Sequence, residues 1–460
     1  MKLLDTIAAI STHYGKGGVA MIRISGTDAV AVGERVFSPA CGVPLSRLAH
    51  GKMVYGLIST PDGQELDDGM AVVFRGPHSF TGEDTVELTC HGGVLITSKV
   101  LQAVLCAGAR AAEAGEFTRR AYVSGRMRLS QAEALGNLLE AKSVSQLMLA
   151  RNGMRGGLAD RTEGIYQSLL DMMTSVYAAI DFPDEDLAEL SRQQLCDGVS
   201  SVLSDIRALA ATYGTGRAIN EGIPTVICGR TNAGKSSVYN RILGYDAAIV
   251  TDVEGTTRDV LRETAVLGKT LLLLCDTAGL RQTEDQVERI GIERTRAALR
   301  GAGLILAVFD LSRPLTEEDL VLAREVSQMG VPSVALLNKC DLGDSFDASA
   351  LREFFGHCVS VSAVDGRGFD KLASVIDEFF IDGSLDVSQD AVVTGARQFA
   401  ALNTASEALE FALTDLRLGV PLDLCCVAME SALTSLGEVD GRELGEEIVA
   451  EIFSRFCVGK

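Results

Sequence analysis

The sequence predicts a multidomain chain that joins an α+β part, an all-α part and an α/β part. Its 460 residues are enough for about three domains of ordinary size. Short β-like runs give way to long helical periodicity near residue 130, and a segment of alternating strand and helix signals lies between two helical blocks. Apolar residues make up 47% and charged residues 23% of the chain, which excludes a largely disordered protein.

The first 128 residues favour an α+β domain. Short runs rich in β-branched residues alternate with turn signals, and a helix is expected over about residues 94–107. The expected strands cover residues 19–24, 52–58, 70–74 and 85–89.

Residues 129–221 and 382–460 favour long helices, because apolar residues such as Ala134 and Leu138 recur at spacings of three and four. Two helical blocks around an α/β segment predict one discontinuous helical bundle, with a compact domain of residues 222–381 inserted into it. The alternative is a pair of separate small helical domains.

The formal net charge is −20, which argues against a protein that coats nucleic acids. This acidity is unevenly distributed, because residues 1–128 carry a net charge of +1 and the three later segments carry −6, −6 and −9. A local RNA site is therefore compatible with the sequence. We expect the chain alone to bind RNA weakly.

The cysteine pattern predicts a cytoplasmic protein. Eleven cysteines are scattered along the chain without a C-x-x-C pair, which favours reduced thiols over disulfides or a zinc site. No apolar run reaches the roughly 18 residues of a membrane helix. Asp5 falls where a signal peptide would have its apolar core, so we expect no secretory leader.

A phosphate-binding loop is predicted at residues 229–236, which match G-x-x-x-x-G-K-[ST] after a buried-type strand and before a helix. Glycines let backbone N–H groups surround the phosphates, and the helix N-terminus adds its positive end. Lys235 should reach the β- and γ-phosphates, and Ser236 should bind Mg²⁺. The predicted nucleotide-binding residues of this loop are Asn232, Ala233, Gly234, Lys235, Ser236 and Ser237.

Three further motifs follow in order, each after a strand: D-x-x-G, N-K-x-D and a Ser-Ala loop. Asp276 would hold the magnesium shell. The Asp341 carboxylate can accept two hydrogen bonds from guanine, which adenine cannot donate, so the sequence predicts GTP and a Ras-like P-loop α/β G domain. The GTP-binding candidates in these motifs are Asp276, Thr277, Ala278, Gly279, Asn338, Lys339, Asp341, Ser362 and Ala363.

A loop between the first two motifs can close on the γ-phosphate, although its Thr and Asp residues also favour an N-cap. Its GTP-binding candidates are Thr251, Asp252, Val253, Glu254, Gly255, Thr256 and Thr257. Leu280 stands where Ras-like enzymes place the Gln that orients water, so a different hydrolytic device is required. Residue chemistry alone does not choose among Glu284, Asp285 and Glu288 for that role.

From end to end, the sequence resembles the MnmE (TrmE) family of tRNA modification GTPases. The stretches that carry the resemblance are 23–26, 79–84, 91–93, 115–118, 131–134, 180–185, 251–259, 276–281 and the terminal Cys-x-Gly-Lys at 457–460. The family pattern implies an N-terminal tetrahydrofolate-binding and dimerisation domain over 1–128, a discontinuous helical domain over 129–221 and 382–460, and a TrmE-type G domain over 222–381.

The resemblance implies a homodimeric, K⁺-dependent GTPase that works with the FAD-dependent partner MnmG in a heterotetramer or larger complex. Together they would add an aminomethyl or carboxymethylaminomethyl group at C5 of the wobble uridine of certain tRNAs. The implied one-carbon donor is 5,10-methylene- or 5-formyl-tetrahydrofolate, and GTP hydrolysis would proceed through dimerisation of the G domains.

Several site residues follow from the resemblance alone. A K⁺ ion would replace an arginine finger, and Glu288 would orient the attacking water, with Arg281 as a candidate helper. The implied K⁺ ligands are Asn232, Thr251, Val253 (through its carbonyl) and Thr256, and Thr257 is the implied Mg²⁺ ligand beside Ser236 of the phosphate loop. The implied folate-binding residues are Arg23, Glu87, Arg126 and Lys460, although the family often has Lys where this chain has Arg126.

Cys457 is a catalytic candidate, because a thiolate could add to C6 of uracil and activate C5. A structural role near the folate site is the alternative, and Gly459 and Lys460 do not fit a prenylation signal. Two other functions compete with the leading one: a G protein of ribosome assembly, and a folate-dependent one-carbon transferase with a regulatory G domain.

Overall fold

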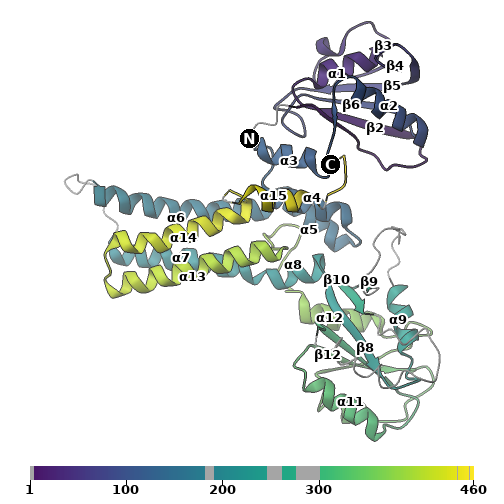
Figure 1. The fold of residues 1–460 in the computed structure, drawn as a ribbon. Coiled ribbons are helices and arrows are strands. Elements are labelled where there is room, and N and C mark those ends of the chain that lie inside the picture. The colour runs from purple at the N-terminus through teal and green to yellow at the C-terminus, as the bar shows by residue number, and fades with distance from the viewer. Residues whose placement is uncertain are drawn as a thin grey trace. The chain divides into compact units, whose positions relative to one another are not determined.

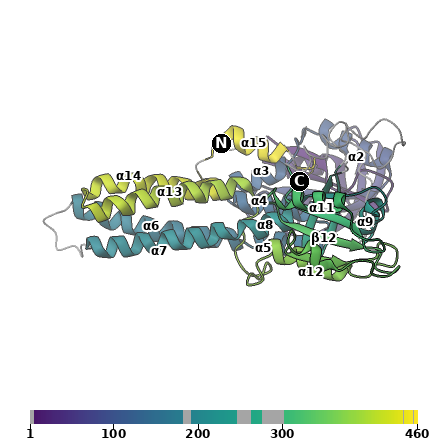
Figure 2. The same cartoon turned by 90° about the horizontal axis from the view of Figure 1, so that it is seen from below.

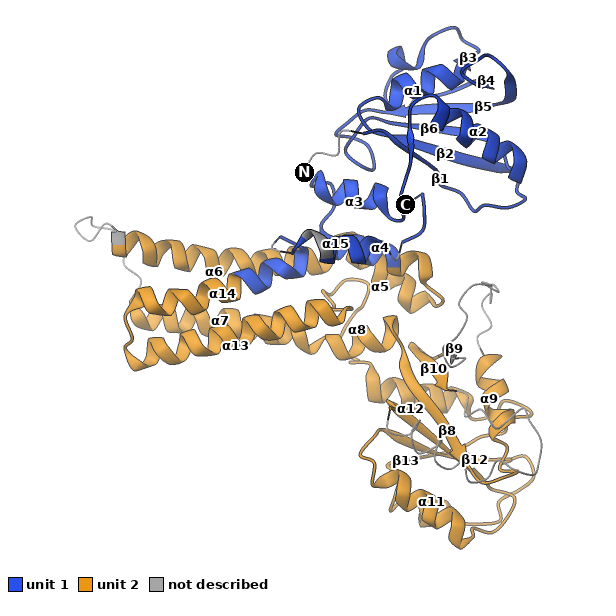
Figure 3. Cartoon of the chain, viewed as in Figure 1, with its two compact units in different colours: residues 1–136, 434–460 blue, residues 137–433 orange. Residues whose placement is uncertain are grey.

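The computed structural model describes residues 5–181, 191–245, 262–275, 301–442, 444–454 and 456–459 (Figure 1). Contacts divide the chain into two compact units, which Figure 3 colours separately. Unit 1 contains residues 1–136 and 434–460, and unit 2 contains residues 137–433. Within the described ranges, every helix is too short or too polar to cross a membrane.

Unit 1 is built on a seven-stranded sheet in the order β3-β4-β5-β6-β2-β1-β7, antiparallel except for the β1–β7 pair. The strands are β1 Ile7–Ile10, β2 Val19–Ser25, β3 Phe37–Pro39, β4 Met53–Ser59, β5 Glu65–Phe74, β6 Thr85–His91 and β7 Arg110–Ala111. The helices are α1 Ala29–Val36, α2 Val94–Cys106, α3 Glu116–Val123, the start of α4 Leu129–Glu140, the end of α14 Leu422–Asp440, and α15 Glu446–Ser454. The four predicted strands and the helix over 94–107 are confirmed.

The two faces of this sheet have different covers. Helices α1 and α2 bury Val32 and Val100 against strand residues such as Ile22 and Leu88. On the opposite face, Phe117 of α3 packs on Ile7 of β1. Strand β4 alternates buried and exposed residues, and its exposed side chains are Met53, Tyr55 and Leu57. A face with apolar side chains in solvent is typical of an interaction surface.

The C-terminal part of the chain completes unit 1. Leu129 of α4 and Phe453 of α15 belong to one small core. The Ser130 hydroxyl donates to Oδ1 of buried Asp440 at 2.6 Å. Residues more than 300 positions apart in sequence therefore stabilise the same unit.

Unit 2 combines long helices with a second sheet. The helices that precede or follow this sheet in sequence are α5 Val144–Met154, α6 Gly157–Asp181, α7 Arg192–Ala211, α8 Tyr213–Asn220 and α13 Ala396–Leu418, together with the start of α14. Helix α7 begins with a capping box, in which Ser191 and Gln194 satisfy each other's backbone N–H groups. Helices α7 and α13, which flank the α/β segment in sequence, pack on each other, and Figures 1 and 2 show α6 and α14 running beside them.

The second sheet has the order β13-β12-β11-β8-β10-β9 and is parallel except for β9. Its elements are β8 Ile223–Gly229, α9 Lys235–Leu243, β9 Arg262–Leu267, β10 Thr270–Cys275, β11 Leu304–Asp310, α11 Glu317–Ser327, β12 Ser333–Asn338, β13 His357–Ser360 and α12 Phe369–Phe380. Helices α9 and α12 cover one face and α11 covers the other. Parallel strands start and end on the same edges, so the loops after β8, β11 and β12 meet.

Candidate functional site

The phosphate-binding loop runs from the end of β8 to the start of α9. Gly229 has φ +151°, and a Cβ there would lie 2.5 Å from the Val308 carbonyl oxygen. Gly234, at φ +93°, precedes the helix and leaves its first N–H groups without a side-chain cap. Both positions therefore require glycine, and the open helix start is the kind of group that binds phosphate.

Lys235 lies over this loop. Its Nζ donates to the carbonyl oxygens of Gly229 at 2.9 Å and Arg230 at 2.8 Å. Burial lowers the pKa of Lys235. A phosphate would supply the negative charge that the carbonyl groups lack, so the amine is well placed to bind one.

Asn338 joins the phosphate loop to the Ser-Ala loop. Its buried amide donates from Nδ2 to the Ala233 carbonyl at 3.0 Å, and its Oδ1 accepts the Ala363 N–H at 3.2 Å. Ser362 is also buried, and Asp341 is exposed. Three of the predicted motifs, more than 100 residues apart at their extremes, thus form one site. Asn232, Ser236 and Ser237 lie in exposed positions of the same loop and helix start.

The sequence reasoning missed Asp310, the last residue of β11. Its Oδ2 accepts a hydrogen bond from Lys339 Nζ at 2.6 Å. An acidic residue at the end of an otherwise apolar strand that pairs with β8 is the signal that could have identified it.

The remaining nucleotide-site candidates lie outside the described residues. They are Thr251, Asp252, Val253, Glu254, Gly255, Thr256, Thr257, Asp276, Thr277, Ala278, Gly279, Leu280, Arg281, Glu284, Asp285 and Glu288.

A second group of predicted residues gathers in unit 1. Arg23 of β2 lies directly across from Glu87 of β6, and its Nε donates to Glu87 Oε1 at 2.9 Å. The two side chains are only 13% and 17% exposed. The Arg23 guanidinium also lies 5.2 Å from the ring centroid of Phe80 and 5.7 Å from that of Phe117. Sequence reasoning missed both aromatic rings.

Arg126 is linked to the same region through the main chain. Its Nε donates to the carbonyl oxygen of Ser79 at 3.2 Å, and Ser79 immediately precedes Phe80. Unlike Arg23, Arg126 is exposed. The region thus offers a carboxylate, a cation over aromatic rings and a second, accessible cation. These groups suit a ligand with a planar ring and an acidic tail.

The C-terminal segment lies against the first strand. Ser11, which directly follows β1, donates its hydroxyl to the Gly459 carbonyl oxygen at 3.1 Å. The Gly115 N–H donates to the main-chain carbonyl oxygen of Cys457 at 3.3 Å. Gly459 has φ +99°, and a Cβ there would meet the Ile10 carbonyl oxygen at 2.2 Å, so this approach requires glycine. Cys457 is exposed. Lys460 lies outside the described residues.

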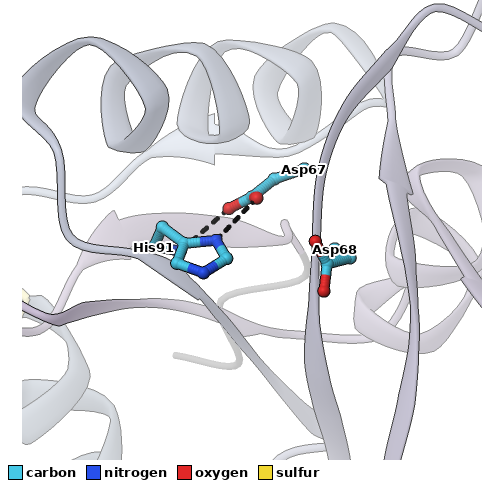
Figure 4. Close-up of side chains that lie close together, drawn as sticks. All are labelled: Asp67, Asp68 and His91. Carbon is cyan, nitrogen blue, oxygen red and sulfur yellow. Dashed lines mark hydrogen bonds and ion pairs between the residues drawn. The ribbon is translucent and has the colours of Figure 1, made fainter.

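One group of possible metal ligands occurs among the described residues, namely Asp67, Asp68 and His91 (Figure 4). The Asp67 carboxylate accepts the main-chain N–H of His91 at 2.8 Å and pairs with its ring Nδ1 at 2.8 Å. This pairing raises the pKa of His91. Asp68 accepts the Tyr55 hydroxyl at 2.9 Å. Because these bonds join β5 to β6 through Asp67 and β5 to β4 through Asp68, we assign the group a structural role.

Comparisons with known proteins cover nearly the whole chain. Residues 6–126 match the family described as "GTP-binding protein TrmE N-terminus", and residues 129–457 match the family described as "MnmE helical domain". Among solved structures, the G domain of the T. maritima FeoB iron transporter is 24% identical over 34% of this chain and 96% of that chain. Its TM-score of 0.26 is too low to support any argument.

Curated relatives align over full length. "tRNA modification GTPase MnmE" of Symbiobacterium thermophilum is 44% identical over 99% of both chains. The proteins of the same name from Lactiplantibacillus plantarum and Geobacillus thermodenitrificans are 41% and 39% identical, over 99% and 100% of this chain and 98% and 100% of theirs. With two family matches that together span residues 6–457 and relatives aligned from end to end, this chain belongs to the MnmE family of tRNA modification GTPases.

Proposed function

We propose that this chain hydrolyses GTP as a component of tRNA modification. The observation that carries the proposal is the position of Asn338, which bonds to the phosphate loop on one side and to the Ser-Ala loop on the other. These two bonds support a base-binding role for Asp341, which follows Asn338 in the same N-K-x-D motif. The names of the full-length relatives support the same activity.

Each residue of the site has a chemical task in this proposal. Lys235 and the N–H groups at the start of α9 bind phosphate oxygens, and Asp341 accepts hydrogen bonds from guanine. Ser236 and Thr257 hold Mg²⁺, and Asn232, Thr251, Val253 and Thr256 hold K⁺. These cations offset negative charge on the phosphates. Glu288 orients the attacking water, in the place of the glutamine that this chain lacks.

The second site supports the one-carbon part of the proposal. Arg23, Glu87, Arg126 and Lys460 bind a tetrahydrofolate that carries the one-carbon unit, with Glu87 accepting hydrogen bonds from the pterin ring. The exposed apolar side chains of β4 favour a homodimer formed through unit 1. With MnmG, the dimer modifies C5 of the wobble uridine in the cytoplasm, and Cys457 is the candidate nucleophile.

Mass spectrometry of tRNA tests the biological role. In a strain without this gene, wobble uridines should lack the C5 group. The wild-type gene should restore it, and a gene encoding Lys235→Ala should not. Normal C5 modification in the deletion strain would refute the proposal and favour a G protein with another task.

GTP turnover in different salts tests the mechanism. The hydrolysis rate should be much higher in KCl than in NaCl at equal ionic strength, because the smaller ion fits the same oxygen ligands poorly. Glu288→Ala should abolish turnover and leave GTP binding intact. Equal rates in the two salts would reject the K⁺ site, and unchanged turnover in the variant would remove Glu288 from its role.

A further inference from the structure

Asp310 ends strand β11, which lies between β8 and β12 in the sheet, and a lysine connects it to the loops that follow those two strands. Lys339 Nζ donates to Asp310 Oδ2 at 2.6 Å and to the main-chain oxygen of Asn232 at 2.9 Å. Lys339 belongs to the N-K-x-D loop and Asn232 to the phosphate loop. One ammonium group therefore connects the end of β11 to both loops.

Asp310 is held in this position by its own neighbours. Its Oδ1 accepts the main-chain N–H of Ser312 at 3.0 Å and the Ser312 hydroxyl at 2.5 Å. The side chains of Asp310 and Lys339 are 13% and 27% exposed, so solvent screens their ion pair less than it would a surface pair. Burial alone would raise the pKa of Asp310, but hydrogen bonds from Lys339 and Ser312 hold that pKa below its ordinary value.

The backbone at both ends of this connection is unusual. Among the described residues, Asn232 and Lys339 are the two non-glycine residues with positive φ, at 64° and 65°. Asparagine adopts this left-handed region fairly readily, whereas lysine does so at a cost of about 1 kcal/mol or more. Such a conformation persists only where the surrounding contacts determine it. The lysine is held at its ammonium group by Asp310 and Asn232.

We propose that Asp310 is a positioning residue, which fixes Lys339 against the phosphate loop and so pre-forms the guanine-nucleotide site before nucleotide arrives. This inference rests on the proposed nucleotide binding. Binding is stronger when a site needs no rearrangement, since loop ordering then costs nothing at the moment of binding. Loss of the Asp310 charge should leave Lys339 free to take other rotamers and should loosen both loops.

The test is the affinity for GDP, measured by fluorescence titration with a labelled GDP. Asp310→Asn keeps the size of the side chain and removes its charge, and its affinity should fall about tenfold, the usual scale for a charge-assisted hydrogen bond. Asp377→Asn is the matched control. Asp377 also accepts several hydrogen bonds, from Lys269 and Thr270, but it belongs to α12 and joins that helix to the β9–β10 turn. Its variant should lose stability and bind GDP as the wild type does.

A second background separates positioning from a general loss of stability. Lys339→Met removes the ammonium group that Asp310 would position. Adding Asp310→Asn to Lys339→Met should therefore weaken GDP binding no further, although the second substitution lowers the unfolding temperature. Wild-type affinity in Asp310→Asn would overturn the inference, and so would an equal loss in both backgrounds. If wild-type protein binds no guanine nucleotide, the proposed function fails as well. If wild type binds and the variant matches it, only the role of Asp310 fails.

Discussion

The two candidate sites are built in different ways. The nucleotide site of unit 2 consists of loops that each follow one parallel strand. The side chains of Asn338 and Lys339 join these loops, mainly by hydrogen bonds to main-chain oxygens and N–H groups. The Arg23–Glu87 site of unit 1 consists of side chains on neighbouring antiparallel strands, beside a segment from the C-terminal part. The first site depends on loop conformation, and the second depends on strand register. Variants should therefore affect the two sites separately.

The largest expected effect is confined to unit 2. Lys235→Ala removes the amine that lies over the phosphate loop, and GTP affinity should fall roughly a hundredfold because a charge-assisted contact is lost. Tetrahydrofolate binding by the same variant should equal that of wild type. Both affinities are measured by titration calorimetry.

Lys269→Ala is the control for this variant, since Lys269 is an exposed lysine in the β9–β10 turn of the same sheet. A parallel loss of folate affinity in Lys235→Ala would show that the two sites are not independent.

A smaller effect is expected in unit 1. Glu87→Gln replaces the carboxylate that pairs with Arg23, and affinity for 5-formyl-tetrahydrofolate should fall about thirtyfold because a neutral amide accepts hydrogen bonds less strongly. GTP turnover should not change. Glu65→Gln, at an exposed position of β5, is the matched control. Unaltered folate affinity in Glu87→Gln would remove Glu87 from the proposed site.

The smallest expected effect is on the stability of unit 1 and concerns an ionic cluster around Glu116. Buried Glu116 pairs with Arg110 at 2.7 Å and Arg120 at 3.0 Å. Burial alone would raise the pKa of Glu116, but hydrogen bonds from Arg110, the Glu113 N–H and Arg120 outweigh it and hold the pKa below its ordinary value of 4.5. The stabilisation is therefore complete above pH 4.5 and is lost as the pH falls through the folded-state value.

Glu116→Gln should lower the free energy of unfolding at neutral pH by about 1.5 kcal/mol, since Arg120 keeps Asp5 and Glu83 as partners. The variant should also lose less stability than wild type on acidification. Urea unfolding at neutral and acidic pH measures both quantities. Glu113→Gln, at an exposed carboxylate nearby, should retain the wild-type acid dependence. If Glu116→Gln retains it too, another group causes the acid sensitivity.

The same contrast explains what could be predicted from the sequence. The strand before residue 229, the glycine positions and the helix after Lys235 follow from local chemistry, so the phosphate loop was predicted residue by residue. The strand over residues 52–58 was likewise predicted from its run of apolar and aromatic residues. These are cases in which the residues that determine the structure are neighbours in sequence.

The rest could not be derived locally. The pairing of Arg23 with Glu87 requires the register of β2 on β6, which sequence spacing does not determine. The family resemblance indicated only that both residues belong to a folate site. Phe80 and Phe117 were missed for the same reason. The role of Asp310 depends on a lysine in a different loop. Each of these depends on a contact between distant parts of the chain.

The hydrogen bond between Ser11 and Gly459 has a consequence for synthesis. Its two residues are 448 positions apart, so a ribosome must make almost all of this chain before unit 1 can acquire its last contacts. Domains usually fold as they emerge, N-terminal part first. Here the sheet of unit 1 can receive its C-terminal contacts only after the whole of unit 2 has been translated. The Arg23 region therefore receives its C-terminal neighbour only after residues 137–433 have been made.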